Sequence, residues 1–144
     1  MATFYKFDCF VEDLAHKQHD LETDLIKYSL VPASNPPSAS TWADVTDLPS
    51  FSYTNVADDG PGSRQINMSA SEQTSGVYKL TADDITITAS GGTIPDFRYI
   101  VIWNDTSTSD SLIGWYDYGN DLALSDTETL LIDFNDSGGM FTIT

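Results

Sequence analysis

Two histidines are the side chains of this sequence whose type and spacing best suit chemistry. His16 and His19 lie three residues apart in a segment with helical periodicity, and Glu12 and Asp20 are close by in the chain. Residues at i and i+3 share one face of a helix, so the pair could bind a metal ion. The chain has neither an HExxH pattern nor an evident third ligand. We therefore interpret the pair as an exposed helix end and keep a metal site as the weaker alternative.

Two acidic clusters offer oxygen atoms that calcium could use. They are Asp58-Asp59-Gly60 and the segment from Asp117 to Asp121, and neither follows EF-hand spacing. Aspartate before glycine is ordinary turn chemistry, so turns are favoured over calcium sites. There is also no G-x-S-x-G nucleophile motif and no phosphate-binding glycine loop. We predict no catalytic residue, no metal and no cofactor, and therefore a protein that is not an enzyme.

A cluster of aromatic residues allows three interpretations. Trp115, Tyr116 and Tyr118 fall on one predicted strand, so their side chains point to opposite faces of it. One face belongs to the core. The other could be a platform for a sugar ring, a contact for a neighbouring subunit, or a surface covered within the monomer, because tryptophan and tyrosine suit all three.

The overall charge restricts the partners. The chain of 144 residues carries 22 acidic and 6 basic side chains, a net charge of −16 at pH 7. Such a surface repels phosphate backbones and anionic membranes, so we expect no nucleic-acid and no membrane partner. Cys9 is the single cysteine, which excludes an intramolecular disulfide and suggests a small buried hydrophobe. The first residues lack the apolar run of a signal peptide, so we expect synthesis in a cytosol.

The elements that position these residues are mostly strands. Phe7, Phe10, Val11 and Leu14 recur at helical spacing and predict one helix at 8–19, with Asp8 as its N-cap. Residues 1–7 suit a strand or an arm, 24–31 a strand, 32–41 a proline-rich loop or arm, and 42–48 a short helical turn. The β-rich core is predicted at 63–144, with strands at 63–69, 76–81, 84–89, 97–103, 111–118, 122–124, 128–134 and 139–144.

These elements predict a fold class. The segment 99–103 is apolar throughout, which is typical of a central strand covered on both faces. Short strands at regular spacing favour a mainly β fold, an antiparallel β-sandwich or jelly-roll-like domain with one short N-terminal α-helix. We expect residues 1–144 to form a single domain.

Several segments together resemble a known group of proteins. They are Phe10 to His16, His19 to Leu30, Thr74 to Leu80, Ala89 to Gly92, Phe97 to Thr106 and Leu112 to Gly119. This set resembles small virion proteins of tailed bacteriophages, and among these the capsid decoration, or cement, proteins. The resemblance implies a structural protein on the exterior of the phage head, made in the bacterial cytoplasm. The implied partners are the major capsid protein and further copies of the chain in a homotrimer.

The contact residues expected for that role come from the aromatic residues and the two extended segments. They are Phe4, Tyr5, Pro36, Pro37, Trp42, Trp115 and Tyr118. One alternative is a tail, baseplate or fibre component. Another is a carbohydrate-binding adhesion module in which Trp115 or Trp42 stacks on a sugar ring.

Overall fold

The computed structural model describes residues 2–49, 54–58 and 64–144, and strands dominate them. The content is 49% strand against 8% helix, which confirms the mainly β prediction. The described elements in chain order are β1 (Thr3–Lys6), α1 (Asp8–Ala15), β2 (Ile26–Val31), the 3-10 helix η1 (Val45–Asp47), β3 (Val56–Asp58), β4 (Gln65–Ile66), β5 (Met68–Thr74), β6 (Val77–Ala82), β7 (Ile85–Ala89), β8 (Ile94–Asn104), β9 (Leu112–Leu124), β10 (Thr129–Ile132) and β11 (Phe141–Ile143).

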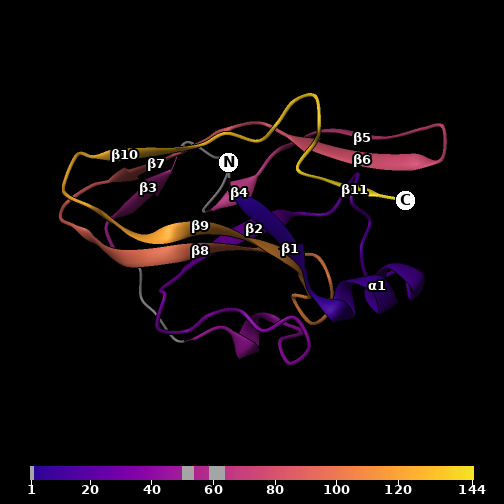
Figure 1. The fold of residues 1–144 in the computed structure, drawn as a ribbon, viewed down its shortest axis with the longest axis horizontal. Helices are drawn as coiled ribbons and strands as arrows, with labels where there is room; N and C mark the ends of the chain where they lie inside the picture. Colours follow the sequence, from indigo (N-terminus) through magenta and orange to yellow (C-terminus); the bar gives the residue numbers. More distant parts are fainter. Residues whose placement is uncertain (1, 50–53, 59–63) are drawn as a thin grey trace.

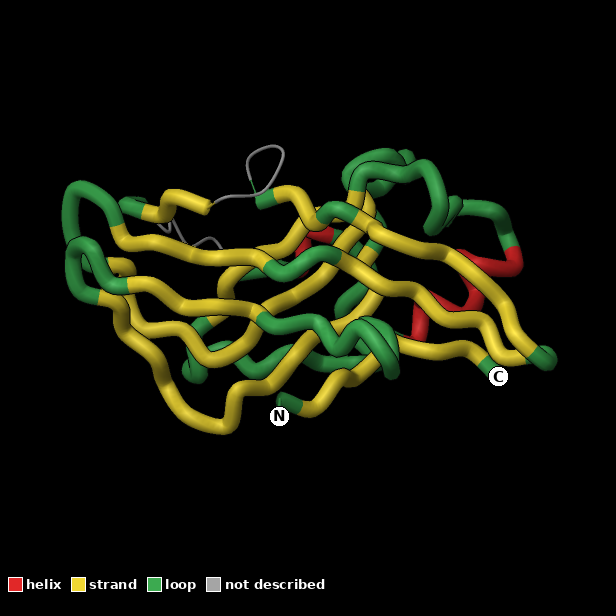
Figure 2. The backbone as a smooth tube through the Cα atoms, turned by 90° about the horizontal axis from the view of Figure 1, so that it is seen from above, coloured by secondary structure: helices red, strands yellow, loops and turns green. Residues whose placement is uncertain are grey.

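Three antiparallel sheets form the sandwich. A five-stranded sheet has the order β1-β9-β8-β2-β4. Facing it are two three-stranded sheets, β10-β7-β3 (the β7 sheet) and β11-β6-β5 (the β6 sheet). Figure 1 shows these two above opposite ends of the five-stranded sheet. In Figure 2, α1 lies at the same end of the molecule as the C-terminus.

The central strand β8 is covered on both faces, as its apolar sequence predicts. Ile100 and Ile102 belong to the main core, which fills the space between the five-stranded sheet and the other two. Tyr99 and Val101 point the other way, into a second core. This alternation follows from the two-residue period of a strand.

The second core lies beneath residues 32–49, which we call the covering segment. This segment crosses the face of the five-stranded sheet that is turned away from the other two sheets (Figure 1). Its Trp42, Val45 and Leu48 pack against that core, in which Phe7 and Trp115 are buried. The predicted proline-rich loop at 32–41 and short helical turn at 42–48 are thus both observed, folded onto the chain's own sheet.

The helix is shorter than predicted. It spans Asp8–Ala15, its N-cap is Phe7, and Asp8 is its first residue and not its cap. Lys17 has φ +61°, a left-handed conformation that ends the helix. The amide of Gln18 closes the end by donating to the carbonyl oxygen of Asp13 at 2.9 Å. The expected helix at 8–19 is therefore wrong in its last turn.

Several strand boundaries also differ from the prediction. Residues 111–118 and 122–124 were expected as two strands, but β9 runs unbroken from Leu112 to Leu124. Gly119 has φ +90° and lies beside register shifts between β8 and β9, so it marks an irregularity within the strand and not a turn. The predicted strand at 63–69 is divided between β4 and β5, which belong to different sheets. The sequence analysis missed β3, and residue 63 is outside the described ranges.

The N-terminal segment is a strand and not a free arm. β1 pairs with β9 at the edge of the five-stranded sheet, with Tyr5 opposite Trp115 and Lys6 opposite Gly114. Gly114 allows this close approach, since a Cβ atom there would lie 2.5 Å from the carbonyl oxygen of Tyr5. Among the described residues, no helix is long and apolar enough to cross a membrane.

Candidate binding groove between β9 and β10

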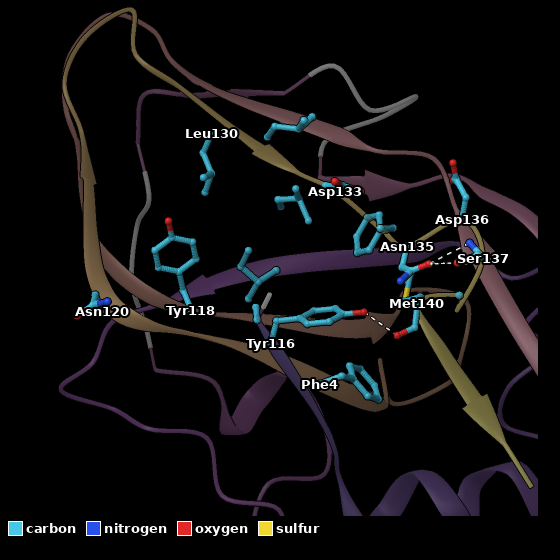
Figure 3. Close-up of a pocket in the computed structure, with 16 residues that line it drawn as sticks. Phe4, Tyr116, Tyr118, Asn120, Leu130, Asp133, Asn135, Asp136, Ser137 and Met140 are labelled. Atoms are coloured by element: carbon cyan, nitrogen blue, oxygen red, sulfur yellow. Dashed lines mark hydrogen bonds between the residues drawn. The ribbon is translucent and has the colours of Figure 1, made fainter.

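A groove opens along the flank where the five-stranded sheet and the β7 sheet meet. Its volume is about 1000 Å³, which is at the upper end for pockets that take small molecules. The lining includes apolar and aromatic side chains from β1, β8, β9, β10 and the segment that follows β10. Figure 3 shows Tyr118 rising from β9 on one side and Leu130 on the other, while Tyr116 lies along the bottom with its hydroxyl at Met140.

The two sides of the groove expose different parts of the backbone. From the five-stranded sheet come alternate residues, such as Tyr116, Tyr118 and Asn120, so the groove lies on the face of that sheet. From the other side come consecutive residues, 130–136, of which 130–132 belong to β10. The side chains of consecutive strand residues point to opposite faces of the sheet. Side chains from both faces of β10 can border the groove only if the edge of β10 faces it. The five-stranded sheet thus forms the floor and the edge of β10 forms a wall.

The edge of β10 that faces the groove carries unused backbone groups. β10 pairs with β7 and lies at the end of its sheet, without a second neighbour among the described strands. A strand edge of this kind presents N–H and C=O groups that another strand can pair with. Leu131, at 58% exposed, and Tyr118, at 49%, add apolar surface beside it.

The rim of the groove is polar and acidic. Asp133 and Asp136 line it together with Asn120 and Asn135, and no Lys or Arg is among the lining residues. Within the described ranges, neither carboxylate forms a hydrogen bond or an ion pair. The groove therefore combines an apolar floor with negative charge at its mouth, and the basic group beside it is the Lys79 ammonium, which donates to the carbonyl oxygen of Ser137 at 3.4 Å.

One end of the groove is held in place by hydrogen bonds. The hydroxyl of Tyr116 donates to the carbonyl oxygen of Met140 at 2.7 Å, which ties β9 to the connection between β10 and β11. Burial raises the pKa of Tyr116, so the hydroxyl keeps its proton and the bond. The amide of Met140 donates to the carbonyl oxygen of Leu80 at 2.7 Å, and Asn135 closes the turn before it. Because of these bonds the groove is part of the folded framework.

The groove brings together only two of the predicted contact residues, Phe4 and Tyr118. Tyr5 is 46% exposed and stacks on Trp115, with ring centroids 5.3 Å apart, on the other face of the sheet. The remaining three lie in the covering segment, where Pro36 is exposed and Pro37 and Trp42 are half-buried.

Trp115 is not an exposed platform. Its side chain is 8% exposed and packs against Phe7 with ring centroids 4.6 Å apart. Trp42 lies over Phe7 with ring centroids 6.4 Å apart and nearly parallel planes. The sequence left three interpretations open, and the one that holds for the face carrying Trp115 is that it is covered within the monomer. Trp115 as a sugar platform is therefore wrong.

The two histidines do not form a metal pair or an exposed helix end together. The His16 side chain is 63% exposed and 3.7 Å from Glu12, whereas the His19 side chain is completely buried beyond the end of the helix. Asn104 lies 3.0 Å from Nδ1 of His19, and Nε2 has no hydrogen-bond partner and lies 3.9 Å from Asp13. Burial lowers the pKa of His19, although the negative charge of Asp13 opposes this. The described residues contain no group of three or more metal-ligating side chains.

The acidic cluster on β9 has a structural use. Both carboxylate oxygens of Asp117 accept hydrogen bonds from Arg98, at 2.8 and 3.0 Å. The Arg98 guanidinium lowers the pKa of that carboxyl. Asp121, at the other end of the cluster, is exposed. The other calcium candidate, Asp58-Asp59-Gly60, includes Asp59 and Gly60, which are outside the described residues.

Cys9 is half-buried and not fully buried as expected. Its sulfur lies 3.8 Å from the carbonyl oxygen of Trp42 and 3.7 Å from that of Leu112, between the covering segment and β9. Burial, with the charge of Asp13 adding to it, raises the pKa of the thiol from 9.0 to about 11.

The sequence analysis missed the wall of the groove, residues 130–136. One signal was available: Leu130, Leu131 and Ile132 are three consecutive apolar residues between two polar ones, Thr129 and Asp133. A strand with one buried face should alternate, so such a run indicates that the outer face has a partner as well.

Comparisons with family models, curated proteins and solved structures find no match to this chain.

Proposed function

We propose that this chain is a structural protein that decorates the outside of a bacteriophage head. In this role it binds the major capsid protein and further copies of itself, and it stabilises the contacts between capsomers. The phage setting rests on the resemblance of the six sequence segments described above. The role as a contact protein rests on the molecule's surface.

The observation that carries the proposal is the open groove beside β10. It combines exposed apolar side chains, an unpaired strand edge and a framework held by hydrogen bonds. Exposed apolar surface with a polar rim marks protein-binding sites. Two side chains whose type could do chemistry have structural contacts instead. His19 lies in a buried network with Asn104, and Asp117 pairs with Arg98.

The charge of the chain supports a position outside the shell. A net charge of −16 repels packaged nucleic acid, whose phosphates are also negative. Repetition over a symmetric shell multiplies a modest contact, so each copy can bind weakly and the set still resists pressure from inside. The covering segment and β1 are folded onto the protein's own sheet. Neither is therefore a free arm, and we expect the contacts to come from the outer surface, which includes the exposed Tyr5 and Pro36.

The test is addition of the purified chain to phage shells that lack it, followed by particle reconstruction. We expect saturable binding, with trimeric density at the local three-fold positions of the shell. A chain that stays monomeric and does not bind such shells would contradict the proposal. Density restricted to a few copies on the tail or baseplate would assign it to the alternative structural role.

A further inference from the structure

We propose that the groove beside β10 accepts an extended, basic segment of a partner protein, which adds to the β7 sheet as a fourth strand. This inference rests on the function proposed above and names the chemistry of the partner that this function requires. The added strand would lie against the free edge of β10 and above the face of the five-stranded sheet.

The shape of the groove favours a strand over a helix or a small molecule. Residues 130–136 border it consecutively, and the first three of them belong to β10, whose outer edge offers backbone groups. Beyond β10 the amide of Phe134 is already used, since it donates to the Asp84 carboxylate at 2.8 Å. In an antiparallel ladder, alternate residues direct both N–H and C=O toward the same neighbour. An added strand satisfies these groups, whereas a helix uses its own backbone groups internally and leaves them unpaired.

The floor of the groove specifies apolar side chains at every second position of the incoming strand. Phe4, Ile100 and Tyr116 lie on that floor, and Figure 3 shows Tyr116 lying along it and Tyr118 pointing toward Leu130. Side chains that point inward from an added strand would contact these residues. Leu131, which is 58% exposed without a partner, would be partly covered.

The charge at the rim specifies basic residues in the same segment. Asp133 and Asp136 lie at the mouth of the groove without Lys or Arg among the lining residues. A lysine or arginine of the incoming strand would compensate them, and the net charge of −16 would speed the encounter with a basic partner.

A second copy of this chain does not fit that description. The chain has only 6 basic residues against 22 acidic ones, and none of the described strands carries two basic residues. Two copies would place acidic surfaces against the acidic rim, which is unfavourable. The occupant is therefore a segment of a different protein.

The probe is a seven-residue peptide of alternating lysine and valine, titrated into the isotope-labelled chain and followed by amide chemical shifts. We expect saturable binding that weakens as salt rises, with shifts concentrated in 129–136 and in β1 and β9. A peptide with glutamate in place of lysine should not bind. Equal binding of the two peptides, or shifts concentrated elsewhere, would overturn the proposal.

N-methylated peptides test whether the backbone pairs. Methyl groups on one alternate set of peptide nitrogens should abolish binding, and those on the other set should leave it nearly unchanged, because only one set faces β10. If both methylated peptides bind as well as the parent, the segment does not add as a strand.

Variants of the chain locate the contact. Leu131→Ser should weaken binding about tenfold, and Asp133→Asn and Asp136→Asn about 1.5- to fivefold each. The matched controls are Val77→Ser, another exposed apolar residue, and Glu22→Gln, another exposed acid, because both lie away from the groove. Equal losses in the controls would contradict the assignment.

The same variants separate this inference from the proposed function. If the wild-type chain binds shells and Leu131→Ser binds them equally well, the groove assignment is wrong and the decoration role stands. If the wild-type chain binds no shell, the decoration role fails, and the peptide titrations still decide what the groove accepts. Self-association that Leu131→Ser abolishes would make a second copy the occupant and overturn the inference.

Discussion

The thiol of Cys9 should report whether the covering segment is closed over the second core. Its sulfur lies 3.6 Å from the carbonyl oxygen of Ala43 in that segment and 3.7 Å from that of Leu112 in β9. Burial raises its pKa to about 11, and the thiolate is the form that attacks a disulfide reagent. Reaction with an aromatic disulfide should therefore be slow while the protein is folded.

The expected rate follows from two opposing effects. A rise in pKa from 9.0 to about 11 lowers the thiolate fraction at pH 8 by a factor of about 100. A thiolate of higher pKa is also more nucleophilic, which increases the rate constant of the thiolate by a factor of roughly 6 to 10. The folded protein should thus react about 10 to 16 times more slowly than the unfolded chain, before any steric hindrance by the covering segment.

The assay measures the release of the coloured thiolate from the reagent between pH 7 and 10, for folded and urea-unfolded protein. In the folded protein the rate should rise about tenfold per pH unit throughout, whereas the unfolded chain should level off near its ordinary pKa. Trp42→Ala removes the ring that stacks on Phe7 at 6.4 Å, so it should loosen the covering segment and increase the rate. The remote variant Val77→Ser should not change it.

Two results would refute this reasoning. One is a folded-state rate that bends near pH 9, as for an unburied thiol. The other is a Trp42→Ala protein that remains folded and reacts at the wild-type rate, because the covering segment would then not control access to the sulfur.

Three further predictions concern the cores. Gly114→Ala should destabilise the protein by about 1–3 kcal/mol and speed amide exchange in β1, because the new Cβ meets the carbonyl oxygen of Tyr5 at 2.5 Å; unchanged exchange would contradict this. Trp115→Ala should cost about 3–5 kcal/mol in urea unfolding, since the side chain is only 8% exposed; an unchanged midpoint would show that it is not core. Burial lowers the pKa of His19 despite the opposing charges of Asp13 and Asp24, so the folded state binds fewer protons and stability should fall as pH drops below about 6.5 through the folded value. His19→Gln should remove that part of the pH dependence of the unfolding free energy, and an identical slope in the variant would exclude His19 as its source.

The sequence was sufficient for the fold class because its signals are local. Ile85 and Ile87 alternate with threonines, a pattern that only a half-buried strand satisfies well, and both are buried in β7. The apolar run at 99–103 predicted a strand covered on both faces, and β8 has a core on each side. The proline-rich segment 32–41 was correctly excluded from regular structure.

The sequence was not sufficient where a long-range contact overrides a local signal. Gly119-Asn120 is a turn signal, but pairing along β8 carries β9 straight through it. The predicted helix end placed His19 on an exposed face, but the left-handed Lys17 redirects the chain and His19 enters a network with Asn104, 85 residues away. Neither outcome has a signature within a short window of residues.

The sequence by itself determined that this protein is acidic, mainly β and built around one doubly covered strand, because charge and periodicity belong to the residues themselves. Only the tertiary structure decided that Trp115 is inside and that Leu131 is outside. For both strands the sequence could not say which face is buried, since the residues that cover a face come from distant parts of the chain. The groove exists for the same reason. It is formed where the edge of β10, set by pairing with β7, meets a sheet face built from β1, β8 and β9.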